Sequence, residues 1–126
     1  MSYEASVFIK GPTGAELLRL LRDRLDTNLA SAKREPNSPS VVQLFGLTLA
    51  VVDGHGLEDD GGIHFSNYEQ QVSFTLYAGR LEPVTGRELC RSLALALAAV
   101  ICEGARAECI VVEELQTILG EFRSEV

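Results

Sequence analysis

Residues 53–64 gather most of the side chains that could take part in chemistry. This stretch holds two histidines, His55 and His64, and four carboxylates interspersed with four glycines. Imidazoles and carboxylates bind divalent metals and act as general acids and bases. Their spacing here matches neither a zinc motif nor the alternating oxygen ligands of an EF-hand loop. The stretch therefore favours a solvated hairpin loop turned by glycine, with no metal and no other cofactor, and a divalent metal bound by His55 and His64 is the alternative left open.

The chain shows no motif for nucleophilic catalysis. Ser66, Ser73 and Ser92 lack the Gly-x-Ser-x-Gly elbow, and neither histidine lies in a motif with a serine or a cysteine. The turn at 11–14 precedes a helix but lacks the lysine and the glycine spacing of a P-loop. The sequence thus favours a protein that is not an enzyme. An enzyme that uses His55 or His64 is the alternative left open.

The chain is acidic, which restricts its partners. It has 126 residues, with 11 Lys and Arg against 18 Asp and Glu, and a net charge of −7. Nucleic acids and anionic membranes would repel such a protein as a whole. We therefore predict a protein partner, basic in charge, and neither nucleic acid nor membrane.

The cysteines and the start of the chain indicate a reducing compartment. Cys90, Cys102 and Cys109 have no zinc-ligand spacing and are odd in number, so plain thiols are predicted. The first residues have neither the basic nor the apolar segment of a secretory signal. The longest apolar run, 93–102, is about half the ~20 residues that span a bilayer. We expect a cytoplasmic protein.

A helix over residues 85–102 is the predicted centre of a single α+β domain covering 1–126. Thr85 and Glu88 have the spacing of a capping box, in which each side chain bonds a backbone N–H at a helix start. Apolar residues then recur at helical spacing, and beyond Leu93 the opposite face is apolar too. We expect such a helix to be covered on most sides. Gly104 is the predicted C-terminal cap.

A second helix is predicted near the start of the chain. Residues 3–10 alternate like a strand, and Gly11-Pro12 ends it. Thr13 and Glu16 form another capping box, followed by a leucine stripe that runs to Leu29. The polar, proline-containing stretch 31–39 predicts an exposed loop.

The remaining segments predict strands. Residues 41–52 form one strand in which Gly46 marks a possible bulge. Residues 63–77 form another, interrupted near Ser66-Asn67, where the apolar phase changes. Residues 109–112 form a further strand. The last segment, 113–123, is compatible with a helical turn or with an edge strand, and both interpretations stay open.

An internal repeat suggests how these elements are arranged. The pattern T-G-x-E-L-x-R-x-L occurs at Thr13 and again at Thr85, each time after a strand and a proline-containing turn. Strand-helix-strand twice over predicts a ferredoxin-like βαββαβ fold, with two helices packed on one face of an antiparallel sheet. Another α+β sandwich, with the same helices and a meandering sheet, is the alternative.

The general plan resembles the small acidic immunity proteins of bacterial polymorphic-toxin and contact-dependent inhibition systems. The likeness is carried by the opening strand at 3–9, the leucine-rich helix from Glu16, the hydrophobic strand pair ending at 72–76 and the second helix. The resemblance implies an inhibitor that covers the active site or substrate channel of a basic toxin domain. Because complementary charge speeds encounter, we expect five carboxylates to contact that partner: Asp53, Glu58, Asp59, Asp60 and Glu69.

A different class of function stays open beside this one. A ferredoxin-like domain can serve as a small-ligand-binding or regulatory module whose sheets pair edge to edge in a dimer. The long helix or the last strand would then supply an apolar interface. The sequence is thus compatible with a monomer or a homodimer.

Overall fold

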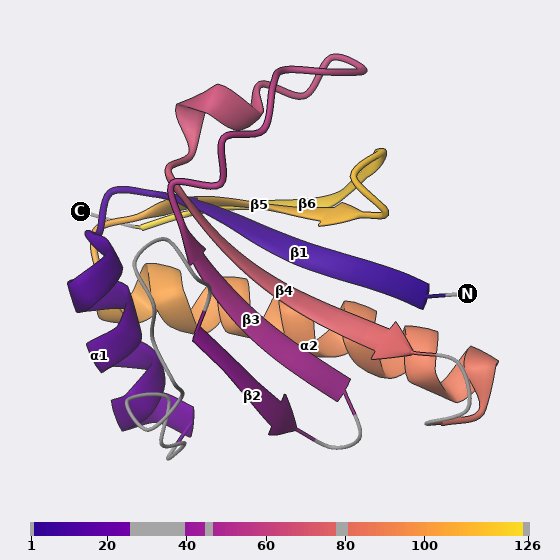
Figure 1. Ribbon diagram of the computed structural model, residues 1–126. Helices are drawn as coiled ribbons and strands as arrows, with labels where there is room; N and C mark the ends of the chain where they lie inside the picture. Colours follow the sequence, from indigo (N-terminus) through magenta and orange to yellow (C-terminus); the bar gives the residue numbers. More distant parts are fainter. Residues whose placement is uncertain (1, 26–39, 45–46, 78–80, 125–126) are drawn as a thin grey trace.

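The computed structural model describes residues 2–25, 40–44, 47–77 and 81–124. They form a six-stranded antiparallel sheet with two helices on one face (Figure 1). In chain order the elements are β1 (Ser2–Lys10), α1 (Gly14–Leu25), β2 (Ser40–Leu44), β3 (Leu47–Asp53), a 3₁₀ turn (Phe65–Asn67), β4 (Gln70–Tyr77), α2 (Pro83–Gly104), β5 (Glu108–Glu113) and β6 (Thr117–Arg123). The predicted α+β class is confirmed. No helix in these ranges is long and apolar enough to cross a membrane.

The order of strands in the sheet is β2-β3-β4-β1-β5-β6. It differs from the simple βαββαβ prediction, because β2 and β6 are additional strands at the two edges. The predicted single strand at 41–52 is wrong: it is a hairpin in which Leu44 pairs with Leu47. Both arms are apolar, so the alternation in the sequence continues across the turn. The turn residues 45–46, with the bulge predicted at Gly46, lie outside the described ranges, as do 31–39 and Leu29.

The larger core lies between the sheet and the helices. Alternate residues of β1, among them Ala5, Val7 and Ile9, point toward the helices and are fully buried. Leu17 and Leu21 of α1 pack into the same cluster. The part contributed by α2 consists of Cys90, Ala94, Leu97, Ala98 and Ile101.

The helix α2 keeps one side open to solvent, so the predicted cover on most sides is found only in part: in 93–102 the residues other than Ala96 and Ala99 are buried or half-buried. Its outer side chains Ser92, Ala96 and Ala99 are exposed. Small side chains leave little apolar surface in water, which makes this exposure tolerable. At its first turns α2 lies very close to β4, because a Cβ on Gly86 would collide with the side chain of Leu76.

The two helices begin in different ways. In α1 the predicted capping box is confirmed, since Glu16 N–H donates to Thr13 Oγ1 at 3.2 Å and Thr13 N–H donates to Glu16 Oε1 at 3.3 Å. In α2 the capping box predicted at Thr85 is wrong. The helix begins at Pro83, a residue suited to the first helical position. Glu82 caps it by accepting from the N–H groups of Val84 (3.1 Å) and Thr85 (2.8 Å).

The ends of two elements also differ from prediction. Gly104 is the last residue of α2, and Ala105, with extended backbone, is the cap. The open question at 113–123 is settled as a strand, β6, which follows a tight turn from β5. In that turn Glu114 and Leu115 have positive φ of 53° and 58°. Such turns usually contain Asn or Gly, so no turn signal in the sequence marks this hairpin.

Candidate protein-binding loop

The predicted acidic stretch forms a loop over residues 54–69 that rises from the sheet on the side opposite the helices (Figure 1). A second apolar cluster, separate from the larger core, holds the loop against the sheet. Ile63 and Phe65 of the loop are buried against Phe8 of β1 and against β5, and the Phe8 and Phe65 rings are 4.8 Å apart. Phe8 is fully buried, so the loop covers this part of the sheet.

The neck of the loop is closed by bonds between the end of β3 and the start of β4. Gln70 Nε2 donates to Asp53 Oδ1 at 2.6 Å, and Gly54 N–H donates to the carbonyl of Glu69 at 2.9 Å. The other Asp53 oxygen lies beside Gly14, where a Cβ would come within 2.6 Å of it. Asp53 therefore stands at the start of α1, where the helix dipole favours a negative charge.

His55 fastens the loop just above this neck. Its Nε2 lies 2.6 Å from the carbonyl oxygen of Tyr68, and its Nδ1 accepts from Leu57 N–H at 2.9 Å. This pair of partners requires the neutral tautomer with the proton on Nε2. The ring also meets Phe8 edge-on, at 5.2 Å. Both ring nitrogens serve the structure, which leaves neither for catalysis or for a metal.

The tip of the loop is a small hairpin. Asp60 and Ile63 exchange both backbone hydrogen bonds, and Gly61 and Gly62 between them have positive φ of 59° and 81°. Next to the hairpin, Asp59 accepts from Ser66 N–H at 2.9 Å and contacts His64 Nδ1 at 3.1 Å.

Asp59 is the strongly perturbed carboxyl group of the loop. The hydrogen bonds from Ser66, and then the one from His64, lower the pKa of Asp59 to about 2. The charged carboxylate is thus the form that holds the tip together.

The five carboxylates predicted to contact a partner are all exposed, but they fall into two groups. Asp53 and Asp59 are engaged in the bonds that shape the loop. The other three have no side-chain hydrogen bond or ion pair with any residue in the described ranges: Glu58, Asp60 and Glu69. They are the groups free to meet another molecule.

A recess of about 340 Å³ opens on this loop. Its lining includes Asp53, Glu69, His55, Tyr68 and two glycines. Its volume is enough for one long side chain, and the free carboxylate of Glu69 suits a lysine or an arginine.

One charged cluster was not foreseen from the sequence. Tyr3 Oη donates to Glu113 Oε1 at 2.6 Å, and Arg91 of α2 reaches the same carboxylate at 2.9 Å. The bond from Tyr3, and then Arg91, lower the pKa of Glu113. Burial raises the pKa of Tyr3. The cluster joins α2 to β1 and β5, and its members are too far apart in sequence for any spacing rule to find them.

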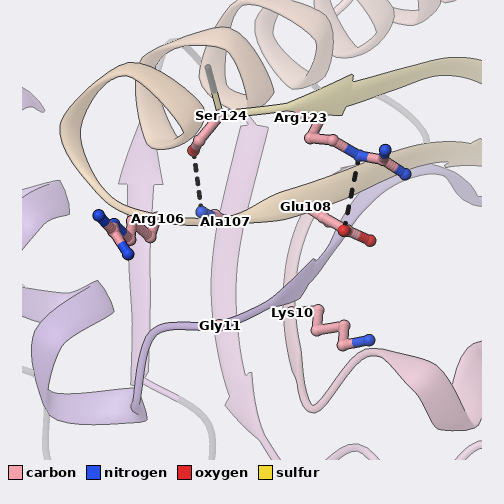
Figure 2. Close-up of a pocket in the computed structure, with 7 residues that line it drawn as sticks. All are labelled: Lys10, Gly11, Arg106, Ala107, Glu108, Arg123 and Ser124. Atoms are coloured by element: carbon pink, nitrogen blue, oxygen red, sulfur yellow. Dashed lines mark hydrogen bonds and ion pairs between the residues drawn. The ribbon is translucent and has the colours of Figure 1, made fainter. Parts of the chain in front are cut away.

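A basic hollow of about 290 Å³ lies where β1 ends and β5 begins, close to the end of the chain (Figure 2). Arg123 pairs with Glu108 at 3.5 Å, while Lys10 and Arg106 have no acidic partner within the described ranges. Figure 2 shows Lys10 and Arg106 pointing to opposite sides of the backbone at Gly11. Because these cations do not converge, the hollow has the character of a solvated charged surface.

Among the residues that the structure describes, no three His, Cys, Asp or Glu side chains are grouped so that they could hold a metal ion. Comparison of the chain with profiles of known protein families, with curated proteins and with solved structures finds no significant match. The candidate site is thus characterised by its geometry alone.

Proposed function

We propose that this chain is a protein-binding inhibitor that neutralises a basic toxin domain, as immunity proteins do, and that the 54–69 loop is its binding surface. One observation carries the proposal: the loop holds exposed, unpaired carboxylates on a framework fixed by its own hydrogen bonds and apolar anchor. A surface that is already ordered loses less conformational entropy on binding than a flexible one.

The arrangement of charge supports a basic partner. Glu58 and Asp60 lie toward the tip and Glu69 at the neck, beside the recess. A lysine or arginine of the partner inserted there would pair with Glu69. The net charge of −7 adds a long-range attraction that accelerates encounter with a positive protein.

The tagged full chain is first used to capture its partner from a lysate of the source cells. Binding of the purified partner to the chain is then measured by biolayer interferometry. The variant Glu58→Gln/Asp60→Asn/Glu69→Gln removes the three free charges without changing side-chain size. We expect its association rate to fall about tenfold or more at low salt and the difference to shrink at high salt.

A matched variant separates the loop from general charge. Asp23→Asn/Glu103→Gln/Glu114→Gln removes three exposed carboxylates elsewhere, and should leave the association rate within about twofold of wild type. Co-expression with the captured partner should relieve its toxicity. Equal effects of both variants, or a partner without toxicity, would contradict the proposal.

A dimeric regulatory module is the second candidate, favoured by the edge strand β6. Ile118 is 43% exposed there and Leu115, in the preceding turn, 38%. This second candidate includes a ferredoxin-like core within the larger sheet. The order of the adjacent strands β3-β4-β1-β5, together with α1 and α2, supports such a core. Sedimentation at several concentrations distinguishes the two, since a concentration-independent monomer would remove the dimer.

A further inference from the structure

Two of the three cysteines meet where α2 gives way to β5. Cys102 lies in the last turn of α2 and Cys109 near the start of β5, and their sulfur atoms are 3.5 Å apart. The Cys102 thiol can also donate to the carbonyl of Ala107, at 3.6 Å. The sulfurs of a disulfide are ~2 Å apart. A shift of about 1.5 Å along the existing contact would therefore bring these two to bonding distance.

The backbone between the two cysteines is held in a compact turn. The Ser124 hydroxyl accepts from Ala107 N–H at 2.9 Å, as Figure 2 shows, and lies 2.7 Å from the carbonyl of Cys102 and 2.6 Å from that of Ala105. Ser124 N–H donates in turn to the Ala107 carbonyl at 2.9 Å. These bonds hold both ends of the turn, so the sulfurs face one another in the folded chain.

We propose that Cys102 and Cys109 form a dithiol site that is reversibly oxidised to an intramolecular disulfide by exchange with a small-molecule disulfide. The Cys102 thiolate attacks one sulfur of the reagent, and the first small thiolate leaves. Cys109 gives up its proton to solvent and attacks Cys102 Sγ, and the second small thiolate leaves. Both leaving groups take up protons. The protein loses two electrons and two protons, and the reagent becomes two thiols.

The surroundings of each thiol determine the order of these steps. Cys102 is half-buried and can meet a reagent, whereas Cys109 is 1% exposed. Burial raises the pKa of the Cys109 thiol above its ordinary range, and contact with Cys102 adds to the shift. Cys109 is thus a poor first nucleophile and acts second, when Cys102 is already in contact with it. Cys90 is fully buried, and burial raises its pKa to about 11.

Peptide mapping tests the proposal directly, because trypsin places each cysteine in its own peptide: 88–91, 92–106 and 107–123. The reduced full chain is incubated with oxidised glutathione, alkylated and digested without reductant. We expect peptides 92–106 and 107–123 to be joined, and titratable thiols to fall from three to one per chain. Non-reducing gels should show a monomer, and added reductant should restore all three thiols.

Three variants test the role of each cysteine. Cys109→Ala should retain glutathione on Cys102, Cys102→Ser should not react, and Cys90→Ser should behave as wild type. Wild-type protein supplies the decisive result even where a variant folds poorly. A stable glutathione adduct on wild-type Cys102, a link through Cys90, or three unchanged thiols would overturn the proposal.

Discussion

Neighbouring residues of the same type have different roles in the loop. Asp59 and Asp60 are adjacent and both exposed, yet Asp59 is bonded to Ser66 and His64, whereas Asp60 contributes only backbone bonds. The sequence places both in an acidic turn and gives no means of telling them apart. The distinction depends on Phe65, because its burial against Phe8 brings the next residue, Ser66, over Asp59.

The role of Asp59 predicts a dependence of stability on pH. Its pKa falls from 3.8 in its ordinary state to about 2 in the fold. A depressed pKa stabilises the fold above the ordinary value, and this contribution is lost as pH falls toward 2. Urea unfolding should show Asp59→Asn less stable than wild type at pH 6, with the difference shrinking between pH 4 and pH 2.

Asp60→Asn is the matched control for this measurement. It removes the same charge from the next residue, where no side-chain bond is lost, and its stability should follow that of wild type at every pH. If the two variants gave the same pH profile, the bonds of Asp59 would not be the cause.

The sequence predicts the helices better than their ends, and the strands better than their pairing. The Thr13 and Thr85 patterns are alike, yet only the first forms a capping box, because Pro83 allows α2 to begin two residues before Thr85. The leucine spacing found both helices. Strand alternation could not locate the β2–β3 turn, because apolar residues lie on both sides of it.

The helix α2 crosses close to β4 at its first turns. A Cβ on Gly86 would collide with the Leu76 side chain. In an exposed helix the change from glycine to alanine is stabilising, but here overpacking should dominate. We expect Gly86→Ala to lower the free energy of unfolding by about 1–3 kcal/mol in chemical denaturation.

A double-mutant cycle separates packing from helix propensity. In a Leu76→Ala background the space beside Gly86 is open, so Gly86→Ala should cost much less there or become stabilising. An equal cost in both backgrounds would mean that the collision is not the reason for glycine at this position.

The strand β1 joins two separate apolar clusters. Its odd-numbered residues, such as Val7, face the helices, and Phe8 faces the loop. The sequence predicted the first cluster through the two helical stripes. It could not predict the second, because Phe8 stands among polar neighbours on its side of the strand, and Ile63 and Phe65 reach it only through the loop's own folding.

Because Phe8 lies in the apolar cluster that anchors the 54–69 loop, we predict that this residue controls the order of the loop. Phe8→Ala should lower the free energy of unfolding by about 3–5 kcal/mol. It should also speed hydrogen exchange at the loop amides of Leu57 and Ser66 more than at the sheet amides, because the loop loses its anchor. Val7→Ala, on the opposite face, should lower stability without this selective effect. If both variants loosened the loop equally, the two clusters would form one cooperative unit, and the loop's order would depend on the whole fold rather than on Phe8.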